Sequence, residues 1–345
     1  MNKYLITLKP VEEYFFGGEN TFRSNENDEA NYFARSNPYP QQTSLLGVLR
    51  YLLLVSNNAL PIKNNKDKAE KLIGEKSFDA SPQKTKQEFG VIDNISPLYI
   101  IDKKTNALYR ITMPYEDFEV NFKGNGNILL STRKDFVPEI NGYNPKKLYL
   151  PILKDKDGNT LSFNDVFKEL PARIGISKDR EQGDDKKFYK QIFYTLNDDY
   201  AFAFYADIAG KYENIDTTII EKGVVFFGGE KKQFEYRFIK PEDEKYISEP
   251  DFSSGNDKIA LLSDALIGKE LLEKIKFMIN NVQEFRTVKI AFDNHKFDKE
   301  QDVSGKINLL KRGTVIFADD PSEIETELNN PIHYRKIGFN HFIKL

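Results

Sequence analysis

The stretch NPYPQQTSLLGVLRYLLL, residues 37–54, runs from a proline-containing loop straight into a strongly apolar helix. Thr43 or Ser44 can cap the start of this helix, because a hydroxyl oxygen accepts hydrogen bonds from free amide groups of the first turn. Apolar side chains then recur at the i, i+3, i+4, i+7 spacing of one helix face, at Leu45, Val48, Leu49 and Leu52. The pattern predicts an amphipathic helix with a buried apolar face.

A second stripe of the same helix carries Thr43, Gly47, Arg50 and Leu54. Glycine costs about 1 kcal/mol relative to alanine inside a helix, so its presence needs a physical reason. A glycine beside an arginine, near the positively polarised start of a helix, leaves room for an anion to approach. We therefore expect Arg50 to lie on a polar stripe that meets a negatively charged ligand.

The composition is that of a globular protein, with 345 residues, 39% hydrophobic and 30% charged, which is long enough for two packed domains. No stretch approaches the roughly 20 apolar residues of a membrane span, and the initial MNKYLITLKP has a strand pattern instead of a signal-peptide pattern. The absence of cysteine excludes disulfides, thiolate metal sites and cysteine nucleophiles. We expect a soluble, cytoplasmic protein without a membrane partner.

The net charge of −3 and the pI near 5.9 do not favour a broadly basic nucleic-acid-binding surface. Any site for RNA must therefore be local. The 27 phenylalanines and 18 tyrosines are typical of β-rich cores and also of surfaces that stack nucleobases. We expect most of them to lie in the core.

The rest of the chain has mainly β-strand patterns. Residues 57–95 are rich in Asn, Lys, Ser and Gln and indicate an exposed, weakly ordered insertion that is helical in part. Residues 172–196 indicate two strands joined by a charged loop, and the apolar spacing over 271–279 predicts an amphipathic helix. Residues 258–345 follow the order strand, helix, strand, strand, helix, strand of a ferredoxin-like domain.

The run FFGGE occurs twice, at residues 15–19 and 226–230, which indicates either two related halves or coincidence. Neither glycine pair belongs to the GxxxxGK[ST] or GxGxxG motifs that bind nucleotide phosphates. Gly228 and Gly229 fit a hairpin turn and a backbone contact to a phosphate equally well.

Side chains for catalysis are scarce. The histidines are His295, His333 and His341, and they match neither a Ser-His-Asp order nor an HExxH motif. His333 and His341 leave open one catalytic alternative, the acid–base cleavage of RNA. Acidic pairs such as Asp198-Asp199 are more typical of solvated loops than of magnesium sites, and we expect no metal or cofactor.

Basic residues gather in loops and at strand ends, where aromatic or glycine residues accompany them. Phosphate contacts combined with stacking planes are the two requirements for binding single-stranded RNA. The candidates are Arg23, Arg35, Arg173, Lys178, Arg180, Lys231, Lys232, Lys311 and Arg312, with Phe188, Tyr189 and Gly313 beside them.

The order of several segments resembles the RAMP superfamily of CRISPR RNA-binding proteins, and is similar in particular to the third subunits of type III-B (Cmr) effector complexes. The resemblance rests on a set of segments in this order: LKPVEEYFFGGENTF, SNPYPQQTSLLGVLRYLLL, RIGISKDR, FYKQIFYTL, FFGGEKKQF, KRGTVIF and IGFNHF. It covers most of the chain.

The resemblance implies an α+β fold of two ferredoxin-like (RRM-like) domains, over 1–170 and 171–345. It also implies an insertion at about 57–95 and a protruding β-hairpin thumb at about 172–196. Such a subunit is not a nuclease: it binds the 5′ handle of the CRISPR RNA and contacts the large polymerase-like subunit and the backbone subunits in antiviral defence.

Carried over to this chain, the resemblance puts a set of residues from the first helix at the handle phosphates: Thr43, Ser44, Gly47 and Arg50. It puts Gly228 and Gly229 in a loop under the handle, and Lys311, Arg312 and Gly313 in a glycine-containing loop before a late strand. Two alternatives stay open, a RAMP-type endoribonuclease that processes CRISPR RNA and a protein-interaction module that does not touch RNA.

Overall fold

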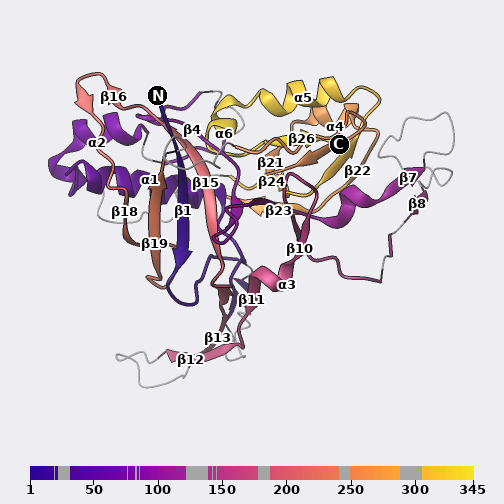
Figure 1. The fold of residues 1–345 in the computed structure, drawn as a ribbon, viewed down its shortest axis with the longest axis horizontal. Helices are drawn as coiled ribbons and strands as arrows, with labels where there is room; N and C mark the ends of the chain where they lie inside the picture. Colours follow the sequence, from indigo (N-terminus) through magenta and orange to yellow (C-terminus); the bar gives the residue numbers. More distant parts are fainter. Residues whose placement is uncertain are drawn as a thin grey trace.

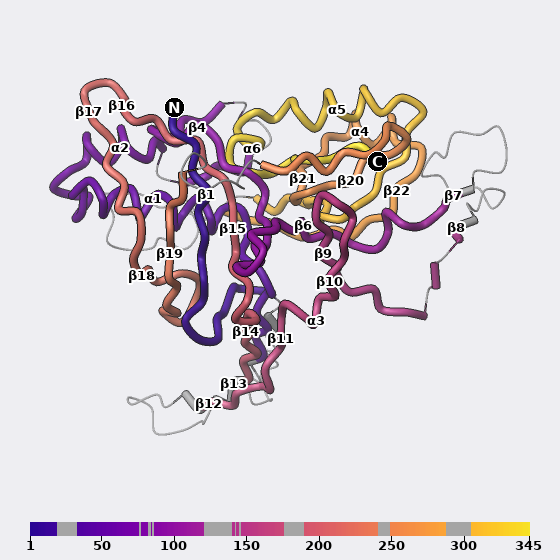
Figure 2. Tube along the Cα trace, viewed as in Figure 1, coloured from indigo at the N-terminus to yellow at the C-terminus, as the bar shows by residue number. Residues whose placement is uncertain are grey.

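The computed structural model describes residues 1–18, 20–21, 32–75, 77–81, 84, 86–121, 139–141, 143–144, 146–177, 187–240, 249–287 and 305–345. These residues form a mixed α/β fold in which antiparallel sheets dominate and helices are few (Figure 1). In Figure 2 the C-terminal segments, orange to yellow, gather beside the sheet that contains the indigo N-terminal strand. No helix within the described ranges is both long and apolar enough to span a membrane.

The largest sheet has nine strands, all paired antiparallel. Across the sheet these are β10 (Thr160–Ser162), β9 (Ile152–Lys154), β6 (Leu108–Thr112), β5 (Tyr99–Asp102), β15 (Tyr200–Ile208), β1 (Asn2–Pro10), β19 (Gln233–Ile239) and β18 (Lys222–Phe226), with β4 (Ile92–Ile95) also paired to β15. Side chains alternate across a strand, so Ile6 and Phe204 enter one apolar core while Leu5 and Tyr205 enter another on the opposite face. The centre of the sheet is therefore buried on both faces.

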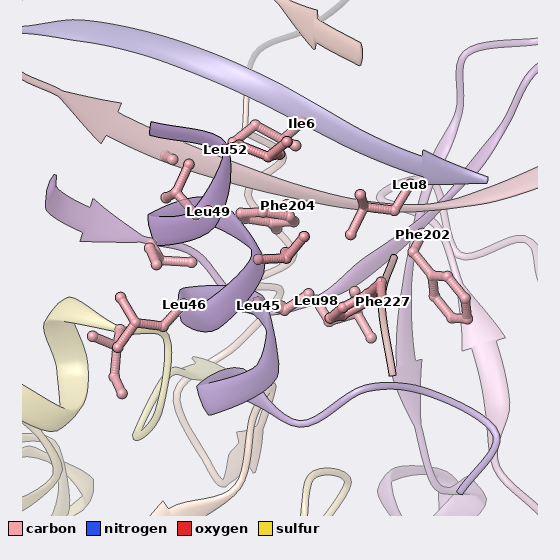
Figure 3. Close-up of a cluster of buried hydrophobic side chains, with 14 of the residues drawn as sticks. Ile6, Leu8, Leu45, Leu46, Leu49, Leu52, Leu98, Phe202, Phe204 and Phe227 are labelled. Atoms are coloured by element: carbon pink, nitrogen blue, oxygen red, sulfur yellow. The ribbon is translucent and has the colours of Figure 1, made fainter. Parts of the chain in front are cut away.

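The predicted helix is α1 (Gln42–Ser56), and it covers one face of this sheet. Figure 3 shows its leucines against the strands, with Leu45, Leu46, Leu49 and Leu52 near Ile6, Leu8, Phe202 and Phe204. The predicted buried face is confirmed, and each buried leucine stabilises the fold by about 1.5–3 kcal/mol.

The start of α1 differs from the prediction, because neither Thr43 nor Ser44 is the N-cap residue. The N-cap is Gln41, which makes no side-chain capping hydrogen bond. The buried side chain of Gln42 instead donates from Nε2 to the carbonyl oxygens of Ser96 (3.0 Å) and Ile337 (3.1 Å). The helix start is thus tied to both halves of the chain.

The segment 57–95 contains η1 (Ile62–Asn64), α2 (Lys66–Ile73) and β4. Its predicted partial helicity is confirmed. The expectation of an exposed and weakly ordered insertion is wrong for the described part, because apolar residues between the polar ones enter the main core. Leu72 and Phe89, for example, are buried in the same cluster as the leucines of α1.

A second sheet holds the C-terminal strands β22 (Phe277–Ile279), β25 (Val315–Phe317), β20 (Ile259–Leu261) and β26 (Phe342–Lys344), again antiparallel. The accompanying elements are β21 (Ala265–Leu266), α4 (Lys269–Lys274), β23 (Val282–Phe285), β24 (Ile307–Leu310), α5 (Pro321–Asn329) and α6 (Ile332–Lys336). The helix predicted over 271–279 is wrong in its second half, where the chain turns into β22.

The predicted region 172–196 contains β12 (Arg173–Ser177) and β13 (Lys187–Ile192), which pair antiparallel. β13 also pairs in parallel with β3 (Tyr32–Arg35), which pairs with β2 (Asn20–Thr21). In Figure 1, β12 and β13 lie at the lower end of the molecule, beyond the main sheet. The remaining short elements are η2 (Pro114–Asp117), β7 (Glu119–Asn121), β8 (Glu139–Asn141), α3 (Phe163–Val166), β11 (Phe167–Glu169), β14 (Tyr194–Leu196), β16 (Lys211–Tyr212) and β17 (Ile215–Asp216).

The sheets do not follow the predicted division into 1–170 and 171–345. β15, β18 and β19 come from the second half of the chain, yet they complete the sheet that β1 begins. The C-terminal sheet starts only at β20. Pairing between distant strands is decided by tertiary packing, which a boundary drawn from local patterns does not capture.

Candidate nucleic-acid interface

A pocket of ≈ 250 Å³ lies where the loop before α1 meets the turn between β24 and β25. Its lining comes from several segments of the chain: Asn37, Pro38, Tyr39, Pro40 and Gln41; Lys311 and Arg312; Met113; Tyr149 and Pro151; and Asp264, Asn281 and Gln283. The pocket brings together two segments that the sequence had singled out separately, the proline loop and the basic turn.

Arg312 is the distinctive side chain of this pocket. It is only 5% exposed, and among the described residues no acceptor forms a hydrogen bond with its buried Nε or Nη1. Its Cζ lies 4.7 Å from the ring centroid of Tyr39, in a cation–π contact. A buried cation is normally paired, because removing an uncompensated charge from water is costly. Arg312 therefore has two donor nitrogens, Nε and Nη1, that no acceptor among the described residues satisfies.

The turn that carries Arg312 requires glycine at its next position. Gly313 has φ +78°, and a Cβ there would lie 2.5 Å from the backbone nitrogen of Met113. The backbone N–H of Arg312 donates to Oδ1 of Asp264 at 2.9 Å. These contacts hold the turn close to the N-terminal sheet, with Lys311 half-buried beside the arginine.

Tyr39 provides an aromatic face that stays neutral. Burial raises the pKa of its hydroxyl, while the positive charge of Arg312 acts in the opposite direction and Asp264 adds to the increase. The net direction is upward, so the phenol keeps its proton at neutral pH.

The sequence missed the polar residues Asn37, Asn281 and Gln283 and the aromatic Tyr149 as members of one site. They come from segments far apart in the chain, and only the packing of the C-terminal sheet against the loop before α1 brings them together. For these missed residues, the one feature of the sequence that indicated the site was the proline-containing loop before α1, which lines the pocket.

The predicted residues of α1 divide into two groups. Thr43 and Ser44 are half-buried just after the pocket-lining Gln41, and Gly47 is exposed, with open space around the place that a Cβ would take. Arg50, in contrast, is 7% exposed, so the expectation that it lies on an exposed polar stripe is wrong. Its Nη2 donates to the carbonyl oxygen of Glu75 at 2.6 Å, and its Cζ lies 5.7 Å from the ring centroid of Phe89.

Arg50 thus fastens α1 to the segment 57–95. Burial lowers the pKa of Arg50 to about 10, with the charge of Glu75 acting in the opposite direction, and the guanidinium remains charged at neutral pH. The apolar pattern of α1 could not predict the burial of Arg50, because the carbonyl oxygen of Glu75 that accepts its hydrogen bond lies in a different segment.

We expect Arg50→Ala to lower the free energy of unfolding by about 2 kcal/mol or more, because it removes a buried side chain together with the charged hydrogen bond that it donates to the carbonyl oxygen of Glu75. Tyr51→Ala is the matched control, since Tyr51 is 48% exposed on the same helix, and we expect a change within about 0.5 kcal/mol. Urea denaturation measures both. Equal stability of the two variants would contradict the structural role of Arg50.

A second cluster of predicted residues surrounds Phe193. Arg173 Nη1 and Lys232 Nζ lie 3.0 Å and 2.6 Å from Oε1 of Glu13. Arg173 Cζ and Lys232 Nζ lie 4.9 Å and 5.3 Å from the Phe193 ring centroid. Burial raises the pKa of Glu13, but hydrogen bonding to Lys232 and Arg173 outweighs it, so the net shift is downward. Glu13 is therefore ionised, and it offsets part of the positive charge of this cluster.

The two FFGG runs contact one another. The rings of Phe16 and Phe227 have centroids 5.1 Å apart, and the N–H of Gly229 donates to the carbonyl oxygen of Phe15 at 2.7 Å. Gly228 has φ +81° in the turn between β18 and β19. The hairpin-turn interpretation of Gly228 and Gly229 is confirmed, and contact with a phosphate stays a prediction.

We expect Gly228→Ala to destabilise the fold strongly, because its Cβ would lie 2.6 Å from the carbonyl oxygen of Phe15. Gly158→Ala is the matched control: Gly158 has a similar φ of +84° but open space around it. The control carries only the left-handed strain of about 1–2 kcal/mol, and Gly228→Ala should cost about 1–3 kcal/mol more because the backbone must shift. Denaturation midpoints that coincide for the two variants would show that the FFGG contact is loose.

The other predicted residues lie apart from the pocket lining. Arg35 Nη2 is 3.6 Å from Oε1 of Glu169, and both side chains are exposed. Lys231 is exposed in the β18–β19 turn. Phe188 and Tyr189 are described only as backbone positions of β13, paired with Ile176 and Gly175. The positions Arg23, Lys178, Arg180 and His295 fall outside the described residues.

The two described histidines lie in packed surroundings. His333 is 3% exposed, with ring centroids of Phe78 and Tyr334 at 5.9 Å and 4.8 Å. His341 lies 3.1 Å through Nε2 from the carbonyl oxygen of Arg335, and burial together with the charge of Arg335 lowers its pKa to about 4. Within the described ranges, no group of three or more His, Asp or Glu side chains is arranged to hold a metal ion.

Among the comparisons with known proteins, one family model matches this chain. The model of the family described as CRISPR-associated protein (Cas_Cmr3) matches residues 6–345. A search of curated proteins found no match. Among solved structures, a chain of the type III-B Cmr-beta complex bound to cognate target RNA is similar in fold, with a TM-score of 0.52 and 14% identity over 99% of this chain and 96% of that chain.

Two further solved structures are more distant. A chain of the same complex with cognate target RNA and AMPPnP has a TM-score of 0.49 and 14% identity over 99% of both chains. A chain of a Csm3-Csm4 subcomplex of a type III-A CRISPR-Cas interference complex has a TM-score of 0.36 and 10% identity, covering 92% of this chain and 93% of that chain.

Proposed function

Because this chain belongs to the CRISPR-associated Cas_Cmr3 family, and is thus a subunit of type III-B effector complexes, we propose that it holds the 5′ handle of the CRISPR RNA. The observation that supports this most directly is Arg312, a buried guanidinium in a polar pocket whose Nε and Nη1 have no hydrogen-bond partner among the described residues. A phosphate oxygen is the natural acceptor for such a fork of donors. The pocket thus suits the RNA backbone.

The neighbouring groups favour a nucleotide over a simple anion. Tyr39 lies against Arg312, and the amides of Asn37, Asn281 and Gln283 can donate to and accept from base edges. The overall charge of −3 fits a local pocket better than a broad basic surface.

We infer that the two sheets are ferredoxin-like units. Numbered along the chain, the four strands of the C-terminal sheet are β20, β22, β25 and β26. Across the sheet they lie in the order β26-β20-β25-β22, which is the order fourth, first, third, second of the ferredoxin-like fold. In the N-terminal sheet β19-β1-β15-β5 follows the same order. The β12–β13 pair at the end of the molecule is then the thumb hairpin.

A bridging role, joining the large polymerase-like subunit to the backbone subunits in antiviral defence, agrees with the exposed apolar residues on the edge strand β18. Val224 and Phe226 are 61% and 62% exposed there. Apolar side chains left in solvent on a sheet edge suit contact with another protein chain. We place this assembly in the cytoplasm.

We propose that the subunit is not itself a nuclease. The ring of His341 is neutral at physiological pH and lies against a backbone carbonyl, and His333 is buried among aromatic rings. A general acid or base needs access to the substrate and a pKa near neutrality. Neither histidine offers both.

The test is to express the chain with the other subunits of its complex, purify the assembly through a tag on this chain, and incorporate 4-thiouridine into the RNA. We expect guides with one fixed 5′ end, and a photocrosslink from the handle to this chain that Arg312→Met weakens. An intact assembly without RNA would favour the protein-interaction alternative. Cleavage of repeat RNA that His333→Ala or His341→Ala abolishes would favour the endoribonuclease.

A further inference from the structure

Four aromatic side chains form a cluster beside the Arg312 pocket, here called the tyrosine cluster: Tyr115, Phe118, Tyr143 and Tyr149. The rings of Tyr143 and Tyr149 are stacked, with centroids 5.9 Å apart and an interplanar angle of 17°. Phe118 lies 5.4 Å from Tyr149 and 6.1 Å from Tyr143. Tyr115 completes the cluster at 6.1 Å from Tyr149.

The tyrosine cluster is continuous with the pocket. Tyr149 belongs to both, since it also lines the pocket that holds Arg312. The pocket residue Asn281 donates from Nδ2 to the hydroxyl of Tyr115 at 3.3 Å. A ligand in the pocket therefore meets aromatic rings at this side.

The tyrosine cluster differs from a hydrophobic core because one of its rings is largely exposed to solvent. Phe118 is 8% exposed and anchors the group, but Tyr143 at the outer end of the stack is 45% exposed. Lys147 is also exposed, and its Nζ lies 5.4 Å from the ring centroid of Tyr149. An exposed aromatic ring next to a cation is the combination that holds single-stranded nucleic acid, by stacking and by charge.

We propose that the tyrosine cluster is a stacking platform for an unpaired base of the RNA whose backbone the Arg312 pocket binds. This inference rests on the proposed function. Tyr143 supplies the outermost aromatic face, Tyr149 connects the stack to the pocket, and Lys147 contacts the adjoining phosphate. Stacking needs only a π face, so the platform tolerates any base.

The competing partner is a protein, because Leu148 in the same segment is 83% exposed. RNA is favoured by the stacked geometry of Tyr143 and Tyr149. It is also favoured because the cluster adjoins the pocket of Arg312, whose Nε and Nη1 have no hydrogen-bond partner within the described part of the chain. A protein contact would depend on Leu148 as well as on Tyr143, whereas base stacking depends on Tyr143 alone. This difference separates the two by experiment.

The experiment titrates the full-length chain with a single-stranded RNA of the handle sequence that carries 2-aminopurine at successive positions. The chain contains no tryptophan, so the fluorescence of this base reports its own stacking without interference. We expect quenching at one position, and a Kd about 5-fold or more higher for Tyr143→Ala with the quenching lost. Tyr143→Phe should behave as wild type, and Tyr143→Leu, which keeps apolar bulk without a ring, should behave as Tyr143→Ala.

The salt dependence separates stacking from phosphate contact. Tyr143→Ala should leave the slope of log Kd against log salt unchanged, whereas Arg312→Met should reduce its magnitude by about 0.7 for one lost phosphate contact. If Tyr143→Ala binds the RNA as tightly as wild type and quenches the 2-aminopurine fluorescence equally, the platform is overturned but the proposed function is not. No RNA binding by the wild-type chain would overturn both. If Leu148→Ser and Tyr143→Ala each cause other subunits to be lost from the assembly while the RNA affinity is unchanged, the cluster is a protein contact instead.

Discussion

Arg312→Met is expected to weaken binding of handle RNA about tenfold or more while leaving the free chain as stable as wild type or more stable. The loss of affinity follows because hydrogen bonds from a charged donor contribute about 1.5–3 kcal/mol. The stability follows because Nε and Nη1 of Arg312 have no hydrogen-bond partner within the described structure. Methionine keeps much of the side-chain length and removes a buried charge, which by itself is favourable.

These opposite signs distinguish a binding residue from a structural one. Titration with labelled RNA and thermal unfolding of the same preparations measure both quantities. Arg237→Met is the matched control, since Arg237 is exposed on β19 and does not line the pocket. A fall in thermal stability of Arg312→Met, with RNA affinity equal to that of the control, would mean that the guanidinium serves the fold.

Glu116→Ala is expected to lower the free energy of unfolding by about 3–5 kcal/mol, the loss typical of breaking one side of a buried ion pair. Glu116 accepts two hydrogen bonds from Arg110, at 2.7 Å and 2.6 Å, and the two side chains are 3% and 7% exposed. Lys154 Nζ lies 3.6 Å from the same carboxylate. The Glu116 carbonyl oxygen also accepts a hydrogen bond from Lys258, so η2 connects the first sheet to the C-terminal one.

A double variant is the control for this pair. Arg110→Met with Glu116→Leu removes both charges and keeps apolar volume, and we expect it to recover most of the stability lost in Glu116→Ala. Guanidinium chloride denaturation of the wild type, Glu116→Ala and the double variant gives the three free energies of unfolding to be compared. A double variant no more stable than Glu116→Ala would show that the shape of the site matters more than its charge.

The same pair predicts a pH dependence. Burial acts to raise the pKa of Glu116, but the hydrogen bonds and charge of Arg110, with Thr112 and Lys154, outweigh it and lower the pKa below its ordinary value of 4.5. A lowered pKa in the folded state stabilises the protein above pH 4.5, and this stabilisation is lost as the pH falls through the folded-state pKa. Glu116→Gln should therefore flatten the decline of unfolding free energy below pH 4.5, as measured by denaturation across that range.

Local patterns predicted those parts of the molecule that depend on neighbours along the chain. The leucine spacing in residues 42–56 identified α1 and its buried face. The patterns after residue 258 indicated a mixture of strands and helices, but not the number and order of elements that the structure has there. The glycine pair at 228–229 was recognised as a possible turn because left-handed backbone is characteristic of glycine.

Contacts between distant segments could not be predicted in this way. Arg50 appears polar on a helical wheel, but the carbonyl of Glu75 and the ring of Phe89 bury it. The apolar run at 271–279 satisfies helix and strand spacing in turn, and pairing of Met278 with Ile316 decides for a strand at its end. The pocket is lined by several segments that lie far apart in the sequence. Of its lining, the sequence alone indicated Lys311, Arg312 and the proline loop.

The strand order of the N-terminal sheet also governs how the chain can fold during synthesis. β1 is made first, yet both of its neighbours, β15 and β19, lie beyond residue 199. The first strand therefore stays unpaired on the ribosome until β15 has emerged, as far as Ile208, and its second edge stays unpaired until β19 has emerged, as far as Ile239. Such late pairing is slow and leaves apolar surface open to aggregation. The subunit is thus expected to depend on chaperones, or on early capture by its partners, more than its size alone would suggest.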